Sequence, residues 1–99
     1  MEMNSFDFIV GWFAAHCDGD WEHDVGIRVA TLDNPGWRVD IRIEDTELQG
    51  IEVDWKVDEQ SEQEWLQWRA TGRFFEARCG PKDLGRAFDA FRLFAEGGR

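Results

Sequence analysis

Segments whose side chains alternate between two faces, joined by connections of hairpin length, constrain the fold most strongly. Period-two alternation is typical of strands that are buried on one face. Parallel neighbours need a long crossover, so the short connections predict an antiparallel sheet. The residues on one face are Val25, Ile27, Val29 and Thr31 in the first segment and Trp37, Val39, Ile41 and Ile43 in the second.

Turn-forming residues separate these two segments. The sequence DNPG spans residues 33–36. Proline fixes the first central dihedral of a type II turn and glycine supplies the positive second one, which suits Pro35 and Gly36. We therefore predict that the two segments form a hairpin.

A third strand and a second hairpin follow. EWLQWRA and RFFEARC are joined by a Thr71-Gly72 turn, which predicts strands four and five. In the third strand, the outward acids are expected either to pair with Arg38 and Arg42 or to form an acidic surface. Its inward residues are predicted as Ile51, Val53, Trp55 and Val57, and its outward residues as Glu52, Asp54, Lys56 and Asp58.

Helical patterns lie at both ends of the chain. Asn4 or Ser5 can cap the first helix, which carries Phe6, Ile9, Val10 and Phe13 inward with Trp12 on its flank. The last helix follows Gly80-Pro81 and stops at Gly97-Gly98. Two helices and an antiparallel sheet of about five strands predict an α+β two-layer fold, with both helices on one face and one domain over residues 1–99. The predicted core includes Ile27, Val29, Val39, Ile41, Val53, Phe88 and Phe91.

Charge narrows the choice of partner. The formal net charge is −10, from 11 Lys and Arg against 21 Asp and Glu. This balance argues against nucleic acid or an anionic membrane as the ligand and favours a basic partner. The first residues lack the basic region and cleavage site of a signal peptide, and their apolar run is too short to span a bilayer. We expect a cytoplasmic protein, with Cys17 and Cys79 as reduced thiols in the core.

The stretch CDGDWEH, residues 17–23, offers three chemistries. With the preceding His16, it could surround zinc through His16, Cys17, His23 and either Asp18 or Asp20. Calcium could bind the alternating acids Asp18, Asp20 and Glu22. The ligand spacings of known zinc and calcium motifs are missing. A thiol beside an imidazole could act as a nucleophile, yet no catalytic motif accompanies it. We therefore predict no metal, no cofactor and no catalytic residue.

A structural role and a binding role remain for this stretch. Trp21 could pack as a lid on the sheet, His23 could make one core hydrogen bond, and the acids could simply be solvated. The acids follow the predicted first helix, however, where the negative end of the helix dipole opposes them. Residues that oppose a local structural preference, with no visible stabilisation in return, are expected at functional sites. The stretch is therefore predicted to be a surface that binds another protein.

Three segments together resemble the immunity protein 53 family of bacterial polymorphic toxin systems. They are CDGDWEH, GIRVATLDNPGW and, near the end, CGPKDLGRAFDAFRLFAE. The middle of the chain, EDTELQGIEVDWKVDEQSEQEW, departs from the family pattern. The resemblance implies a cytoplasmic antitoxin that binds a protein toxin, with no reaction and no cofactor.

The resemblance and the charge give one functional prediction and one alternative. The prediction is an immunity protein that binds and neutralises a cognate toxin through an acidic surface. The toxin is expected to present a basic surface, and neither nucleic acid nor a membrane is expected as a partner. The alternative is a small-molecule- or metal-binding domain, with or without enzymatic activity, that uses the CDGDWEH loop. The predicted toxin-binding residues are Asp18, Asp20, Trp21, Glu22, His23, Asp33, Asn34, Glu52 and Asp54.

Overall fold

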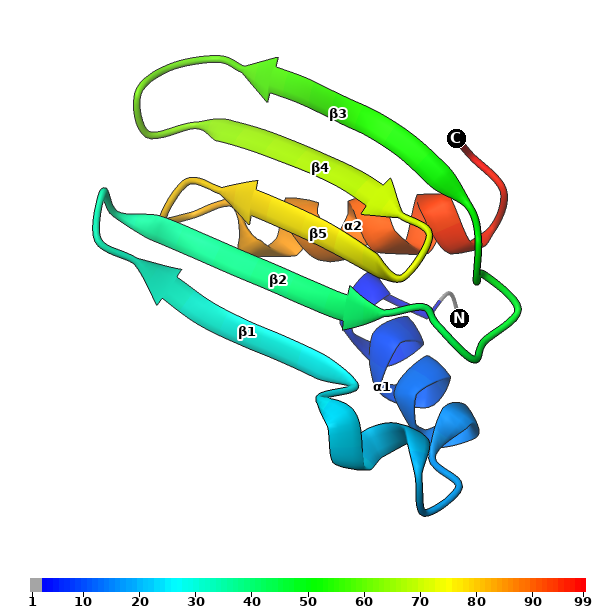
Figure 1. Cartoon of the computed structure of the whole chain (residues 1–99). Helices are drawn as coiled ribbons and strands as arrows, with labels where there is room; N and C mark the ends of the chain where they lie inside the picture. The colour runs from blue at the N-terminus through cyan, green and yellow to red at the C-terminus, as the bar shows by residue number, and fades with distance from the viewer. Residues whose placement is uncertain (1–2) are drawn as a thin grey trace.

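A computed structural model of the chain describes residues 3–99. The chain begins with a helix, continues through a short 3-10 helix and five strands, and ends with a second helix (Figure 1). Neither helix is long and apolar enough to cross a membrane within this range. The elements are α1 (Ser5–His16), η1 (Trp21–Asp24), β1 (Ile27–Leu32), β2 (Gly36–Arg42), β3 (Glu52–Glu59), β4 (Trp65–Thr71), β5 (Phe74–Cys79) and α2 (Leu84–Ala95).

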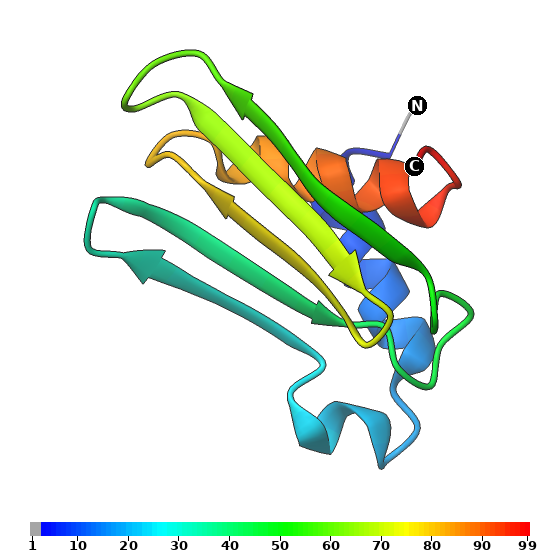
Figure 2. The ribbon, with the colours of Figure 1, turned by 45° about the horizontal axis from the view of Figure 1, so that its top comes forward.

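The strands form one antiparallel sheet in the order β1-β2-β5-β4-β3. Both helices lie on the same face of this sheet, and the other face is open (Figures 1 and 2). The predicted α+β architecture is therefore confirmed. Because β3 pairs with β4 and not with β2, β1 and β3 become the two edges of the sheet.

The core lies between the sheet and the helices. Phe75 of β5 is fully buried and packs against Trp68 of β4, 5.4 Å between ring centroids, and Phe91 of α2, 5.2 Å. Val39, Ile41 and Phe91 are fully buried as predicted, and Ile27, Val53 and Phe88 are half-buried. Val29 is 42 % exposed, contrary to prediction, because it lies on the edge strand β1.

Helix α1 buries only part of the predicted face, since Ile9 and Phe13 contribute to the core as predicted but Phe6 and Val10 are exposed. Its first turn is capped by Asn4, whose side chain accepts a hydrogen bond from the Asp7 N–H at 2.7 Å. Ile9 and Trp12 are buried, whereas Phe6 and Val10 are 59 % and 51 % exposed. The helix is apolar nearly all round, so packing decides its orientation: Trp12 sits edge-on to Phe91 of α2, 5.1 Å between centroids. Trp12 is thus a core residue and not a flanking one.

The turn between β1 and β2 differs from the predicted type II turn. Leu32 pairs with Gly36, so the connection consists of Asp33, Asn34 and Pro35. Gly36 is already in β2 and does not have the positive φ that this turn requires. Its lack of a side chain serves another purpose, since an added Cβ would lie 2.2 Å from the Cys79 carbonyl oxygen.

A β-bulge changes which residues of β3 face the helices. The pairing with β4 shifts between Val53 and Lys56. After the shift, Lys56 lies over Trp68, 5.5 Å from its ring centroid, and Asp58 forms an ion pair with Arg86 of α2. Trp55 and Val57, predicted to point inward, therefore lie on the open face. The predicted alternation is confirmed up to Val53, and the inserted residue inverts it from there.

Glycines lie in the turn of the second hairpin and at the end of α2, as predicted. Gly72, with φ of +89°, begins the two-residue connection between β4 and β5. At the end of α2, Gly97 N–H donates to the Phe94 carbonyl and Gly98 N–H to the Leu93 carbonyl. These two bonds form a Schellman motif, in which Gly97 has φ of +96°.

Candidate functional site

In the loop after α1, two of the predicted acids bond to the backbone. The Asp18 carboxylate accepts from the N–H groups of Asp20, at 2.9 Å, and Trp21, at 3.0 Å. Glu22 accepts from the N–H groups of Asp18, at 3.0 Å, and Gly19, at 2.8 Å. These carboxylates therefore satisfy backbone donors that would otherwise be free. Their position at the end of α1 has a local structural reason that the sequence did not show.

The same hydrogen bonds fix the charge of both groups. Bonds from the Trp21 and Asp20 N–H groups lower the pKa of Asp18. The pKa of Glu22 is lowered by its own N–H and by those of Asp18 and Gly19. The loop therefore favours the ionised form of both side chains. Neutralising them should weaken the loop, which reverses the expectation from the helix dipole alone.

Trp21 lies in the core and not on the surface. It is only 4 % exposed, and its ring packs against Trp12 and Phe13 of α1, each 5.7 Å between centroids. Its indole N–H donates to the Glu44 carbonyl oxygen at 3.1 Å. Trp21 therefore has a packing role, but on the rings of α1 and not as the lid on the sheet that was considered, and it does not belong to the proposed binding surface.

A histidine–glutamate pair joins α1 to the connection between β2 and β3. His16 Nε2 lies 2.6 Å from the Glu47 carboxylate, and Nδ1 lies 2.7 Å from the Trp12 carbonyl oxygen. The Trp12 indole N–H also donates to Glu47, at 3.1 Å. Two acceptors on two ring nitrogens are best matched by the doubly protonated imidazolium. Partial burial alone would lower the pKa of His16, but these hydrogen bonds and the Glu47 charge outweigh it and raise that pKa.

The pair predicts a specific pH dependence of stability. A histidine whose folded pKa lies above its ordinary value of 6.5 contributes fully below pH 6.5 and loses its contribution as pH rises through the folded pKa. We therefore expect the stability difference between wild type and His16→Gln to shrink as pH is raised from 6 to 9 in urea unfolding. Because Glu47 is mostly exposed, the pH-dependent part should stay below about 1 kcal/mol.

The exposed His23, in η1, provides the control. His23→Gln makes the same substitution without touching the Glu47 pair, and we expect it to leave stability nearly unchanged across this pH range. A difference between wild type and His16→Gln that grows with pH would contradict the imidazolium assignment. The earlier idea that His23 makes a core hydrogen bond is wrong, since its side chain is exposed.

Arg42, at the end of β2, lies close to three acidic side chains. Its guanidinium lies 3.0 Å from Asp45, 3.3 Å from Glu44 and 4.0 Å from Asp24. The loop after α1 and the segment after β2 therefore form one acidic end of the molecule. We call this region the acidic end; its acids are Asp18, Asp20, Glu22, Asp24, Glu44, Asp45 and Glu47.

The other predicted residues lie elsewhere. Asp33 and Asn34 are exposed in the turn between β1 and β2, at the opposite end of β1 from the acidic end. Glu52 and Asp54 are exposed on β3, the far edge of the sheet. Four strand spacings separate the two edges, which is about 19 Å. The structure thus divides the predicted residues into a set at both ends of β1 and a set on β3.

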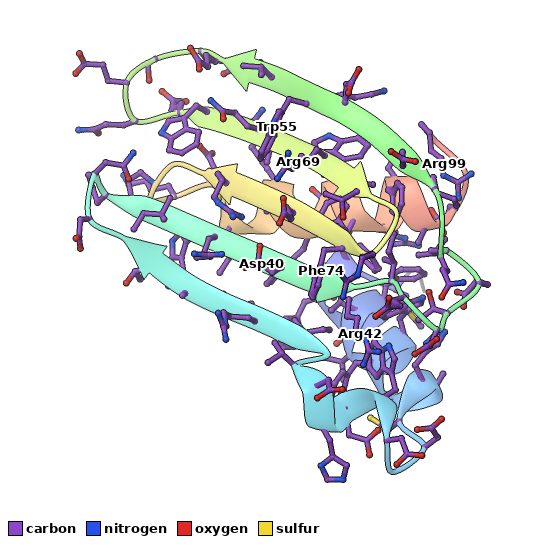
Figure 3. All side chains as sticks on the ribbon, in the orientation of Figure 1. Asp40, Arg42, Trp55, Arg69, Phe74 and Arg99 are labelled. Atoms are coloured by element: carbon purple, nitrogen blue, oxygen red, sulfur yellow. The ribbon has the colours of Figure 1, made fainter. Side chains whose placement is uncertain are left out.

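The open face of the sheet is rich in arginine, which the sequence did not predict. Asp40 is buried between Arg38, at 2.7 Å, and Arg78, at 3.0 Å. Arg69 pairs with Glu76, and its guanidinium lies 4.8 Å from the Trp55 ring centroid (Figure 3). The expected pairing of the third-strand acids with Arg38 and Arg42 is therefore wrong. The alternation of Arg38, Asp40 and Arg42 along β2 was the sequence signal that could have predicted this arginine-rich face.

The CDGDWEH loop offers little for metal or thiol chemistry. Within residues 3–99, no three His, Cys, Asp or Glu side chains form a cluster that could hold a metal ion. Cys17 is exposed, contrary to the expected core position, and Cys79 is buried. Burial and the Asp83 charge raise the pKa of Cys79 to about 11. Partial desolvation and the charges of Glu22 and Asp18 also raise the pKa of Cys17, so neither thiol is activated as a nucleophile.

Comparison with protein families decides the identity. The model of immunity protein 53 matches residues 6–96. The chain belongs to the immunity protein 53 family. No curated protein and no solved structure matches it. Membership favours a binding role over a catalytic one, and the suspected family is confirmed.

In this immunity protein, several residues of the resembling segments have packing roles. A Cβ on Gly26 would lie 2.8 Å from the Trp21 ring. The Trp37 indole N–H donates to the Pro81 carbonyl at 3.0 Å, which joins TLDNPGW to CGPKD. Asp83, buried in the same connection, accepts from the Trp65 N–H at 2.9 Å. These residues hold the hairpins and α2 together, so their presence in a family motif does not mark a binding surface.

Proposed function

We propose that this chain is a cytoplasmic antitoxin that binds a cognate bacterial polymorphic toxin and neutralises it by binding, without turnover. The family match over residues 6–96 carries the proposal. Two thiols with raised pKa values and the mainly structural bonding of Asp18 and Glu22 support a binding role over a catalytic one.

We also propose that the toxin presents a basic surface to the acids of this chain. The net charge of −10 favours association with a cationic partner. Asp20 and Asp33 are the most useful residues for a test, since both are exposed at opposite ends of β1. Asp20 makes no capping hydrogen bond through its side chain, so replacing it leaves the loop intact.

The double variant Asp20→Lys/Asp33→Lys tests this surface. We expect it to bind the toxin encoded by the neighbouring gene about tenfold or more weakly, mainly through slower association, because rim charges act on the encounter rate. Association rates of wild type and variant at two salt concentrations give the measurement. The variant should also show a shallower salt dependence.

A matched control carries the same charge change on the other edge. Glu52→Lys/Asp54→Lys alters β3 and should slow association much less. If both double variants bind like wild type, the acidic surface is contradicted. If wild type itself does not bind this toxin or protect cells from it, the antitoxin function towards that partner is contradicted.

A further inference from the structure

The two edges of the sheet are protected very differently. β3 carries a bulge and a charge at Glu52, Asp54, Lys56, Asp58 and Glu59, which are the usual means of preventing pairing with another chain. β1 has the sequence IRVATL, with one charge, and pairs with β2 in continuous register. The β1 edge is therefore suited to accept a further strand.

The backbone of β1 supplies the hydrogen-bonding groups. Arg42 N–H donates to the Gly26 carbonyl at 2.8 Å, which sets the phase of the antiparallel ladder. Bonded and non-bonded pairs alternate along such a ladder. The N–H and C=O groups of Ile27, Val29 and Thr31 consequently point away from β2, towards the free edge.

An apolar groove lies beside this edge, on the helix side. It has a volume of about 220 Å³ and is lined by apolar residues of α1, α2, β1 and β2. Phe6 and Val10 of α1 and Val29 of β1 line it and are all strongly exposed, and the half-buried Phe88 of α2 lies among them. A strand added to β1 would direct every second side chain towards this groove.

We propose that an extended segment of the toxin adds to β1 as a sixth strand, with apolar side chains at alternate positions in the groove and basic residues at its ends. This inference rests on the proposed antitoxin function. The acidic charges at the two ends of β1 favour a foreign strand over a second copy of this chain, since Asp24 and Asp33 are exposed there. A second copy of β1, paired antiparallel about its midpoint, would place Asp33 of each chain near Asp24 of the other, which is repulsive. Basic residues in a foreign strand would instead pair with both.

Two variants test the edge in different ways. Val29→Lys puts a charge at the mouth of the groove. Thr31→Pro leaves the groove intact and removes one outward N–H, a change that edge strands tolerate. The control is Val57→Lys, which replaces an exposed valine on the other edge strand. The affinity of each purified full chain for the toxin from the neighbouring gene is measured. Thermal melts check that each variant is folded, sedimentation gives the oligomeric state, and amide exchange reports on β1.

We expect Val29→Lys and Thr31→Pro each to weaken toxin binding at least about tenfold, and Val57→Lys to change it less than about threefold. Toxin should also slow exchange at the Val29 and Thr31 amides of the wild type. Wild-type affinity in folded Val29→Lys and Thr31→Pro, or unchanged exchange in β1, overturns the edge assignment while the antitoxin function stands. A free protein that is dimeric, and that Val29→Lys makes monomeric, assigns the edge to a second copy and overturns the inference. Failure of wild type to bind the toxin removes the function and the inference together.

Discussion

Replacing Trp21 by alanine is expected to lower the free energy of unfolding by about 3–5 kcal/mol, the range found for large aromatic residues deleted from cores. The ring fills the space between α1 and the start of β1, where it meets Trp12 and Phe13. Alanine would leave a cavity there and would also remove the hydrogen bond to the Glu44 carbonyl. Small domains have a total stability of about 5–15 kcal/mol, so the variant should be close to unfolding at elevated temperature.

Trp55→Ala is the matched control for this prediction. Trp55 is 43 % exposed on the open face of the sheet and contacts Arg69. Its removal should cost less than about 1 kcal/mol. Urea unfolding followed by circular dichroism gives both values. Equal stability of the two variants would contradict the core assignment of Trp21.

The Trp21 prediction also affects how binding experiments are interpreted. A tryptophan in a family motif is an obvious candidate for a hot spot, because exposed interface tryptophans often contribute strongly to affinity. Here the side chain is 4 % exposed, so any loss of toxin binding in Trp21→Ala would follow from its lowered stability and not from a lost contact with the toxin. Loss of protection by this variant therefore carries no information about the surface. Variants of Asp20, Val29 and Asp33 are informative because these residues are exposed.

The fold was predictable where local chemistry decides it. Gly72 and Gly97 have positive φ at the turn and at the helix end where glycine was expected. The face of α1 was not predictable, because Phe6 and Val10 are as apolar as Ile9 and Trp12 and only packing chooses between them. The bulge in β3 was equally hidden, since periodicity shows alternation but not an inserted residue.

The candidate site was harder to predict than the fold because it depends on strand order. Asp33 directly follows β1 and Glu52 begins β3; both are exposed acids, and nothing in the sequence indicates that they lie far apart. Because β5 and β4 lie between β2 and β3, Asp33 and Glu52 are at opposite edges of the sheet. The backbone hydrogen bonds of Asp18 and Glu22 were also invisible, because they depend on the path of the loop. A prediction from charge alone therefore treated Asp18 and Glu22 as free surface groups, although both bond to the backbone.

Gly36→Ala is expected to lower the free energy of unfolding by about 2–3 kcal/mol, since overpacking against backbone cannot relax by a side-chain rotation. The new Cβ would lie 2.2 Å from the Cys79 carbonyl oxygen, next to the Trp37–Cys79 pair at which the pairing of β2 with the central strand β5 begins. One strand would have to move, and the move would disturb Trp37, which pairs with Cys79 and bonds to Pro81.

The same substitution at Gly85 should have the opposite sign. Gly85 lies in α2, and an added Cβ there meets no atom within 4 Å. Alanine in a helix is favoured over glycine by about 0.5–1 kcal/mol, so Gly85→Ala should raise the midpoint of urea unfolding while Gly36→Ala lowers it. A Gly36→Ala protein as stable as wild type would show that the Cys79 carbonyl can move aside. The glycine of the DNPGW motif would then need another explanation, and contact between its backbone and the toxin would become the first to test.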